Sequence, residues 1–192
     1  MSPRFGISNT PAMVFNVALI GHSQLPFAVD SHDDIVYTVF RKPGATTHDL
    51  EFSPLNQVFT QGPFNLIIFF IGGNDVVQYK NDPLALVHML RSCLFKLKAI
   101  TSKVVFANLE NREYAVDSRF DITTDEYMSV AKKVNRILFK FCAKQHIHTL
   151  HTSNPRFFGK YRSDGVHFDH EARLILIEKF KTCAIRAKES TQ

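Results

Sequence analysis

The sequence of 192 residues contains no tryptophan and only three cysteines, Cys93, Cys142 and Cys183. The cysteines lie far apart, no CxxC or CxxH pattern of a metal site occurs, and their odd number does not suit a full set of disulfides. Each cysteine falls within an apolar-periodic segment. We therefore expect three buried free thiols in a reducing compartment.

Long apolar runs are also missing. The run Val14–Ile20 is too short to span a bilayer, and it leads into a polar motif instead of a signal-peptide cleavage site. We therefore expect an intracellular protein, cytoplasmic and without a membrane span. The same features would suit a domain excised from a larger protein, and the sequence indicates no particular oligomeric state.

The chain has no block of five or six like charges, although its formal net charge is +5 and its pI is about 9.2. A mildly basic protein can attract anionic partners such as RNA or an acidic membrane surface. Scattered charges equally suit an ordinary solvated surface. Charge alone therefore leaves an RNA or other anionic partner as an open alternative.

Short apolar runs alternate with helical patterns along the chain. Buried strands are predicted at Val14–Ile20, Ile35–Phe40, Asn65–Ile71, Lys103–Ala107 and, more weakly, His146–Leu150. Apolar spacings of three and four predict helices from Pro83 to Leu97, from a cap at Thr124 to Phe141, and from a cap at Asp169 to about Ala187. This alternation indicates an α/β fold with a parallel sheet. We expect one domain with its core at about residues 13–187 and frayed ends.

Polar motifs follow several of the predicted strands. They are Gly21-His22-Ser23, Pro43-Gly44-Ala45-Thr46-Thr47, Gly72-Gly73-Asn74-Asp75 and the late Ser163-Asp164-Gly165-Val166-His167. In a parallel α/β sheet the carboxyl ends of the strands form one edge, where active sites lie. Each motif alone suits a turn or a helix cap, but their joint order favours a shared site.

These motifs resemble the conserved blocks of the SGNH hydrolases, also called the GDSL-like family, from Val14 to about Ala184. The matching residues are Ser23 in IGHSQL, Gly44 in RKPGATT, Asn74 in IGGND, and Asp164 with His167 as the final Asp-x-x-His. The resemblance implies a flavodoxin-like three-layer α/β/α sandwich with a mostly parallel five-stranded sheet. It also implies a serine esterase that needs no metal or organic cofactor.

The chemistry of these residues suits an esterase. A serine hydroxyl is a poor nucleophile until a base takes its proton, and His167 would be that base for Ser23. Asp164 would hold the ring of His167 in one tautomer. The backbone N–H groups of Ser23 and Gly44 and the side-chain amide of Asn74 would form an oxyanion hole, as the resemblance implies.

The sequence departs from the family pattern at two places. His22 stands where the first block usually has aspartate, and it would either tune the charge of the site or hydrogen-bond a neighbouring loop. Only 20 residues separate Ser23 from Gly44, and Pro26 favours a turn or loop there instead of a full helix. A shortened wall favours a shallow, open pocket and a small ester with an acetyl-like acyl group.

The segment before the triad motif mixes basic and aromatic residues. His22, Arg156, Phe158 and Arg162 are candidate substrate-binding residues, which could recognise an anionic or planar group. The alternative function is a catalytically weak or inactive module on the same fold that binds RNA or another anionic partner, as in some proteins related to mobile elements. A nucleotide-binding flavodoxin-like protein is disfavoured because no Gly-x-Gly-x-x-Gly or Walker pattern occurs.

Overall fold

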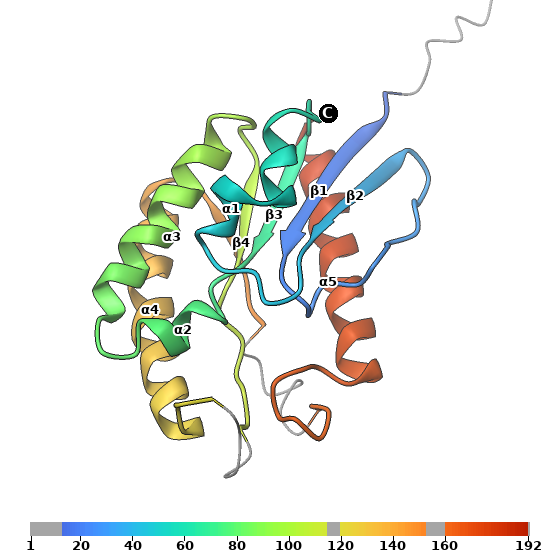
Figure 1. Ribbon diagram of the computed structural model, residues 1–192. Helices are drawn as coiled ribbons and strands as arrows, with labels where there is room; N and C mark the ends of the chain where they lie inside the picture. Colours follow the sequence, from blue (N-terminus) through green and yellow to red (C-terminus); the bar gives the residue numbers. More distant parts are fainter. Residues whose placement is uncertain (1–12, 115–119, 153–159, 192) are drawn as a thin grey trace, which may run out of the picture.

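The computed structural model describes residues 13–114, 120–152 and 160–191. Its centre is a five-stranded sheet in which every neighbouring pair is parallel (Figure 1). The strands are β1 (Phe15–Gly21), β2 (Ile35–Arg41), β3 (Leu66–Phe70), β4 (Val104–Ala107) and β5 (His148–Leu150), in the order β2-β1-β3-β4-β5. All five predicted strands are confirmed, with ends that differ by two residues or fewer.

Three long helices connect and follow the strands. They are α3 (Pro83–Lys98), α4 (Thr124–Lys144) and α5 (His170–Glu189). Shorter segments are α1 (Asp49–Phe52), the 3-10 helix η1 (Pro54–Phe59) and α2 (Asp75–Gln78). Asp169 caps α5 as predicted, because its carboxylate accepts from the Ala172 N–H. The predicted cap of α4 is wrong by one residue: Thr123 caps it and forms a reciprocal capping box with Glu126.

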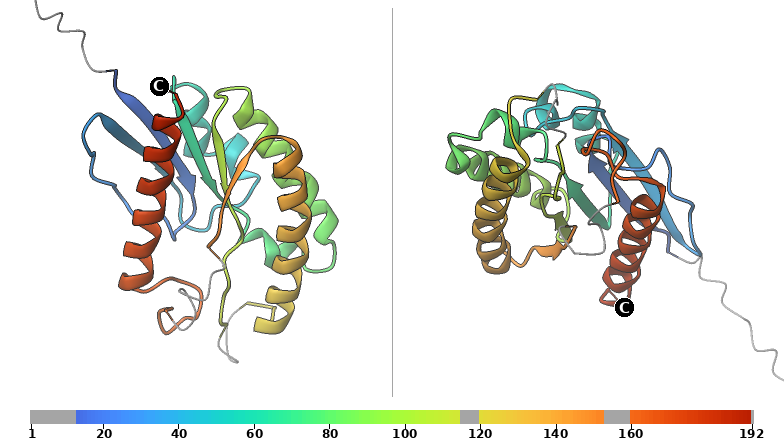
Figure 2. Two further views of the ribbon diagram at one scale, coloured as in Figure 1. Left: turned by 180° about the vertical axis from the view of Figure 1, so that it is seen from behind. Right: turned by 90° about the horizontal axis from the view of Figure 1, so that it is seen from below.

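The helices cover both faces of the sheet, which gives three layers (Figure 2). Alternate side chains of each strand point to opposite faces. Ile67 and Phe69 of β3 therefore pack in the cluster formed with α3 and α4. Ile68 and Phe70 pack in the cluster formed with α5. The flavodoxin-like three-layer α/β/α architecture is thus confirmed.

The described cysteines form no disulfide. Cys93 and Cys142 are buried as expected, whereas Cys183 is only half-buried on α5, so the expectation of three buried thiols is wrong at that position. None of the helices in the described ranges combines the length and apolar character that crossing a bilayer requires.

The strand order fixes where a site can form. The chain leaves β1 toward β2 on one side, and β3 then pairs with β1 on the other. In parallel α/β sheets ligands bind at such a reversal, beyond the carboxyl ends of the strands, which here are β1 and β3. The segment from His22 to Asp34 contains turns and no helix, as predicted, so no helix from this segment covers the carboxyl edge of the sheet.

Candidate active site

The structure brings Ser23, His167 and Asp164 into a hydrogen-bonded chain. The Oγ of Ser23 lies 2.9 Å from Nε2 of His167, and Nδ1 of His167 lies 2.6 Å from Oδ2 of Asp164. Ser23 follows β1 directly, and the other two residues come from the loop before α5. The 2.9 Å contact lies within the reach of about 2.6–3.2 Å that a general base needs to take the hydroxyl proton.

Asp164 is held in place by its own loop. Its Oδ1 accepts hydrogen bonds of 2.9 Å from the backbone N–H groups of Val166 and His167. Burial alone would raise the pKa of Asp164, but the hydrogen bonds from His167 and Val166 outweigh it and lower the pKa to about 2. An ionised Asp164 accepts from Nδ1–H, which leaves Nε2 of His167 free to accept the Ser23 proton.

Gln24 joins the serine loop to the histidine loop, a role that sequence reasoning missed. Its side-chain Nε2 donates to the Val166 carbonyl, and its side-chain oxygen, Oε1, accepts from the Phe168 N–H at 2.8 Å. Val166 and Phe168 are the two chain neighbours of His167, so these two bonds hold the backbone on both sides of the histidine. Gln24 is buried, so water competes little for them. Its position directly after the nucleophile was the only available signal.

The predicted oxyanion donors belong to three separate loops, which follow β1, β2 and β3. Gly44 has a φ of +72°, which glycine adopts without strain. In the described part of the chain, neither the Ser23 N–H nor the Gly44 N–H donates to a protein acceptor. The Nδ2 of Asn74 donates to the Ala45 carbonyl at 2.9 Å, which ties the asparagine to the Gly44 loop and leaves its second N–H unassigned.

A buried ion pair orients Asn74. The Nη2 of Arg112 donates to Oδ1 of Asn74 at 3.1 Å, which defines the side of the amide that carries the donor nitrogen. Arg112 also donates to Oε1 of Glu110 from Nε at 2.9 Å and from Nη2 at 2.7 Å. Both side chains are buried. Burial would raise the pKa of Glu110, but Arg112 and then His22 hold it well below its usual range.

His22 is buried next to the serine loop and presents no surface to solvent. Its side chain is fully buried, and its ring packs against Phe70 with centroids 4.8 Å apart. Its Nε2 lies 3.7 Å from Oε1 of Glu110, and its Nδ1 accepts weakly from the Gln24 N–H at 3.4 Å. Its predicted role as a substrate-binding residue is therefore wrong, because a ring with no exposed surface cannot contact a substrate. Of its two suggested roles, contact with a neighbouring loop is the one its surroundings favour.

A second buried carboxylate ties two of the loops together. Asp75 accepts from the backbone N–H of Thr47 at 2.9 Å and from its hydroxyl at 2.6 Å. This contact links the loop after β2 to the start of α2. Burial is the main cause that raises the pKa of Asp75. The loop that contains Gly44 and the loop that contains Asn74 are thus joined through Asp75 as well as through Asn74.

The remaining predicted substrate-binding residues fall outside these contacts. Arg156 and Phe158 lie outside the described residues. Arg162 is exposed, and its backbone N–H donates to the His167 carbonyl at 2.7 Å, so it directly flanks the triad loop.

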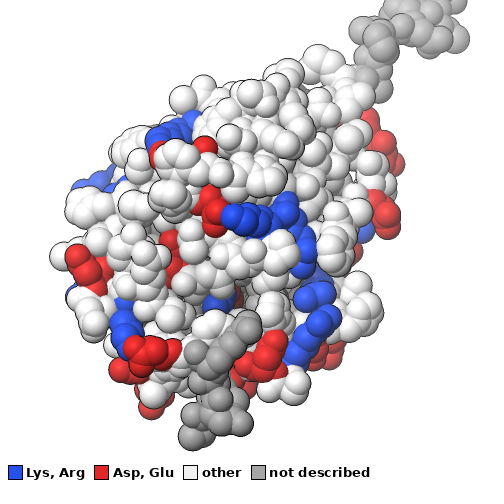
Figure 3. All heavy atoms as spheres, viewed as in Figure 1, with Lys and Arg blue, Asp and Glu red and all other residues white. Residues whose placement is uncertain are grey.

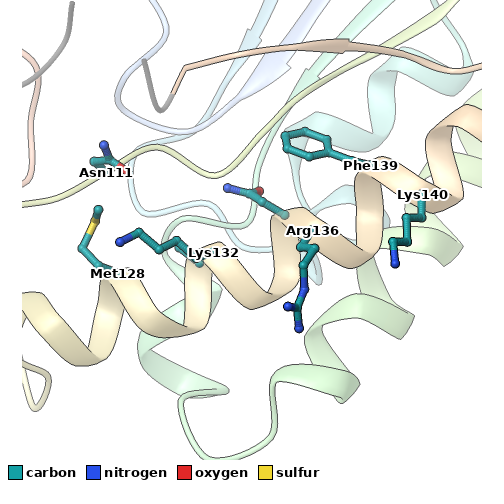
Figure 4. Close-up of a pocket in the computed structure, with 8 residues that line it drawn as sticks. Asn111, Met128, Lys132, Arg136, Phe139 and Lys140 are labelled. Carbon is teal, nitrogen blue, oxygen red and sulfur yellow. The ribbon is translucent and has the colours of Figure 1, made fainter. Parts of the chain in front are cut away.

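A cavity of about 500 Å³ lies along α4, and no triad residue lines it. Figure 4 shows Lys132, Arg136 and Lys140 spaced one turn apart on this helix, with Asn111 facing the helix from another segment. An RNA or other anionic partner stays a prediction, since nothing in this cavity identifies an occupant.

Comparison with known proteins agrees with the geometry at the level of fold. No protein-family model and no curated protein matches the sequence. Among solved structures, a carbohydrate acetylesterase family member from Sinorhizobium meliloti aligns with a TM-score of 0.69 at 14% identity, over 91% of this chain and 99% of that one. A GDSL-like lipase from Bacteroides thetaiotaomicron aligns with 0.66 at 18% identity, over 90% and 88%. An acetylxylan esterase from Geobacillus stearothermophilus aligns with 0.61 at 16% identity, over 90% and 94%. The chain therefore has the fold of the SGNH, or GDSL-like, hydrolases.

Proposed function

We propose that this protein is a carboxylic-ester hydrolase that acts through a Ser23 acyl-enzyme. The observation that carries the proposal is the continuous chain from Ser23 Oγ through His167 to Asp164. A nucleophile, a base and a residue that orients the base, each within hydrogen-bond reach of the next, are the parts that acyl transfer requires.

In the first half-reaction, Ser23 Oγ attacks the ester carbonyl carbon while its proton passes to Nε2 of His167. The tetrahedral intermediate collapses, the bond to the alcohol oxygen breaks, and His167 returns the proton to that oxygen. In the second half-reaction, water attacks the acyl-enzyme with His167 again as base, and the acid leaves. Asp164 stays ionised and stabilises the imidazolium in both halves.

The negative oxygen of each intermediate needs donors that are already in place. The N–H groups of Ser23 and Gly44 and the amide of Asn74 are suited to this role, because both N–H groups lack a protein acceptor in the described part of the chain and the Asn74 amide is bonded to the Gly44 loop. Arg112 fixes the orientation of the Asn74 amide from below. Preorganised donors of this kind contribute about 3–4 kcal/mol each to transition-state stabilisation.

The proposed substrate is an ester with a small acyl group. The segment between β1 and β2 contains no helix, so it provides little surface against which a long acyl chain could be buried. The fold neighbours include proteins described as acetylxylan esterases and a carbohydrate acetylesterase family member. An acetyl-like group fits both considerations.

The test is hydrolysis of para-nitrophenyl acetate by the wild type, Ser23→Ala and Ser92→Ala. Ser92 is an exposed serine on α3 and serves as the matched control. We expect Ser23→Ala to lose about 10³-fold or more of kcat, and Ser92→Ala to match the wild type. Equal rates for wild type and Ser23→Ala, with both proteins folded by circular dichroism, would overturn the proposal.

A further inference from the structure

Three arginines lie in segments that adjoin the triad, because Arg41 donates to the Ser23 carbonyl, the Arg162 N–H donates to the His167 carbonyl, and Arg173 follows the triad loop in α5. Arg41 ends β2, Arg162 precedes the triad loop, and Arg173 lies in the first turn of α5. In the same view as Figure 1, Figure 3 shows a band of Lys and Arg side chains on this face of the molecule. We call Arg41, Arg162 and Arg173 the arginine cluster.

Arg41 is fixed against the backbone of the serine loop. Its Nη2 donates to the Ser23 carbonyl at 3.1 Å, and its Nε donates to the Leu25 carbonyl at 2.9 Å. The exposed ring of Phe27 lies against the guanidinium, 4.1 Å from centroid to Cζ. A guanidinium carries five N–H donors, so Arg41 keeps donors beyond the two that hold the serine loop.

Arg173 and Arg162 complete the cluster. The Nε of Arg173 is buried and has no hydrogen-bond partner among the described residues. Burial lowers the pKa of Arg173, and the positive charges of Arg162 and Arg41 lower it further. Arg173 thus lies within the electrostatic reach of both other arginines.

The described carboxylates leave the arginine cluster without an ion pair. Within the described ranges, no acidic side chain forms an ion pair with any of the three arginines. Asp164 is the one carboxylate whose charge acts favourably on Arg173, and it is already bonded to His167. Arginines without an ion pair beside the serine loop, two of them partly buried, form a site for an anion, since guanidinium groups match carboxylate and phosphate geometry.

We propose that the substrate of this site is an ester that itself carries a carboxylate or phosphate group, bound by Arg41, Arg162 and Arg173. This inference rests on the proposed esterase function and adds its substrate class. Because Arg41 contacts the backbone of Ser23, the anionic group belongs to the same small molecule as the scissile ester and lies close to it.

The first experiment compares acetate esters of phenols whose para substituents differ in charge. The carboxylate probe is para-acetoxybenzoate, its neutral partner is methyl para-acetoxybenzoate, and para-acetoxyphenyl phosphate is the phosphate probe. We expect the wild type to have a kcat/KM about tenfold higher for an anionic probe than for the neutral ester, with a preference that declines as salt is added. The better of the two anionic probes identifies the group that the cluster binds.

Arginine variants test whether the arginine cluster causes the preference for an anionic ester. Arg162→Gln and Arg173→Gln should each lower the ratio of anionic to neutral kcat/KM by about tenfold, and the ratio cancels any effect common to both esters. Lys133→Gln removes the same charge from an exposed position on α4 and should leave the ratio unchanged. A wild-type ratio near one, or a ratio that the arginine variants do not change, would overturn the inference while leaving the esterase function intact.

Failure of the esterase function has a different signature. If the wild type hydrolyses none of the esters, binding of the same probes to Ser23→Ala by calorimetry still tests the arginine cluster. Tighter binding of an anionic probe, lost in the Ser23→Ala/Arg162→Gln double variant, would support the anion site. Equal binding of charged and neutral probes would refute it.

Discussion

Replacing Arg112 by methionine should destabilise the protein far more than the loss of an ordinary surface charge. The guanidinium makes two hydrogen bonds to Glu110, one to the Tyr114 hydroxyl at 3.1 Å and one to Asn74. Methionine keeps much of the length and apolar volume of the side chain but provides no donor. The substitution therefore leaves the fully buried Glu110 carboxylate without its main partner.

The magnitude follows from burial. Removing one partner of a buried ion pair costs about 3–5 kcal/mol, because the other charge stays desolvated. For a chain of this size each kcal/mol shifts Tm by about 2–4 °C, so Arg112→Met should lower Tm by about 6–20 °C. Removing both charges in Glu110→Gln/Arg112→Met should recover about 1–4 kcal/mol relative to Arg112→Met alone.

The assay is urea denaturation followed by far-ultraviolet circular dichroism, since the chain contains no tryptophan. Lys80→Met is the control, because it breaks an ion pair with Asp121, whose side chain is 98% exposed. That change should cost less than about 1 kcal/mol. An Arg112→Met variant as stable as the control, or a double variant no more stable than Arg112→Met, would refute the reasoning about the buried pair.

Three further predictions concern the site. Asn74→Ala should lower kcat for para-nitrophenyl acetate by about 10²–10³-fold through loss of an oxyanion donor, and an unchanged kcat would remove Asn74 from that role. Because the pKa of Asp164 is lowered to about 2, its ionised form stabilises the fold above an unfolded value of about 3.9. The stability difference between wild type and Asp164→Asn in urea should thus be constant above about pH 5 and shrink as the pH falls toward 2; a difference that grows on acidification would contradict this. His22→Asp should destabilise the fold, and Glu110→Gln should partly rescue it; equal melting temperatures for His22→Asp and wild type would argue against this coupling.

The fold and the residues of the triad chain could be predicted because their signals are local. A strand buried on both faces must be almost wholly apolar, so β1 and β3 are visible as runs in the sequence. Ser23 and Asn74 follow these strands directly, and parallel pairing alone places them at one edge. The cap of α4 was misplaced by one residue because Thr123 and Thr124 are chemically equivalent, and only the partner, Glu126, distinguishes them.

The supporting network could not be predicted in the same way. Glu110 and Arg112 follow β4, the strand whose end carries none of the four polar motifs. Charged residues are seldom fully buried unless paired, so two charges after a strand are normally interpreted as a solvated loop. Arg41 and Arg173 are separated by more than a hundred residues from one another in the sequence, and only the packing of α5 beside β2 makes them neighbours.

The histidine at position 22 is best understood together with Glu110. Aspartate at position 22 would place a second carboxylate within a few ångströms of a buried Glu110, and two such charges in a desolvated space repel strongly. An imidazole avoids that repulsion in its neutral form and attracts Glu110 when protonated. Its ring also packs on Phe70 and accepts from the Gln24 N–H, so it supports the residue that brackets His167. Position 22 therefore depends on the charge at position 110, and the departure from Gly-Asp-Ser is compatible with an intact nucleophile loop.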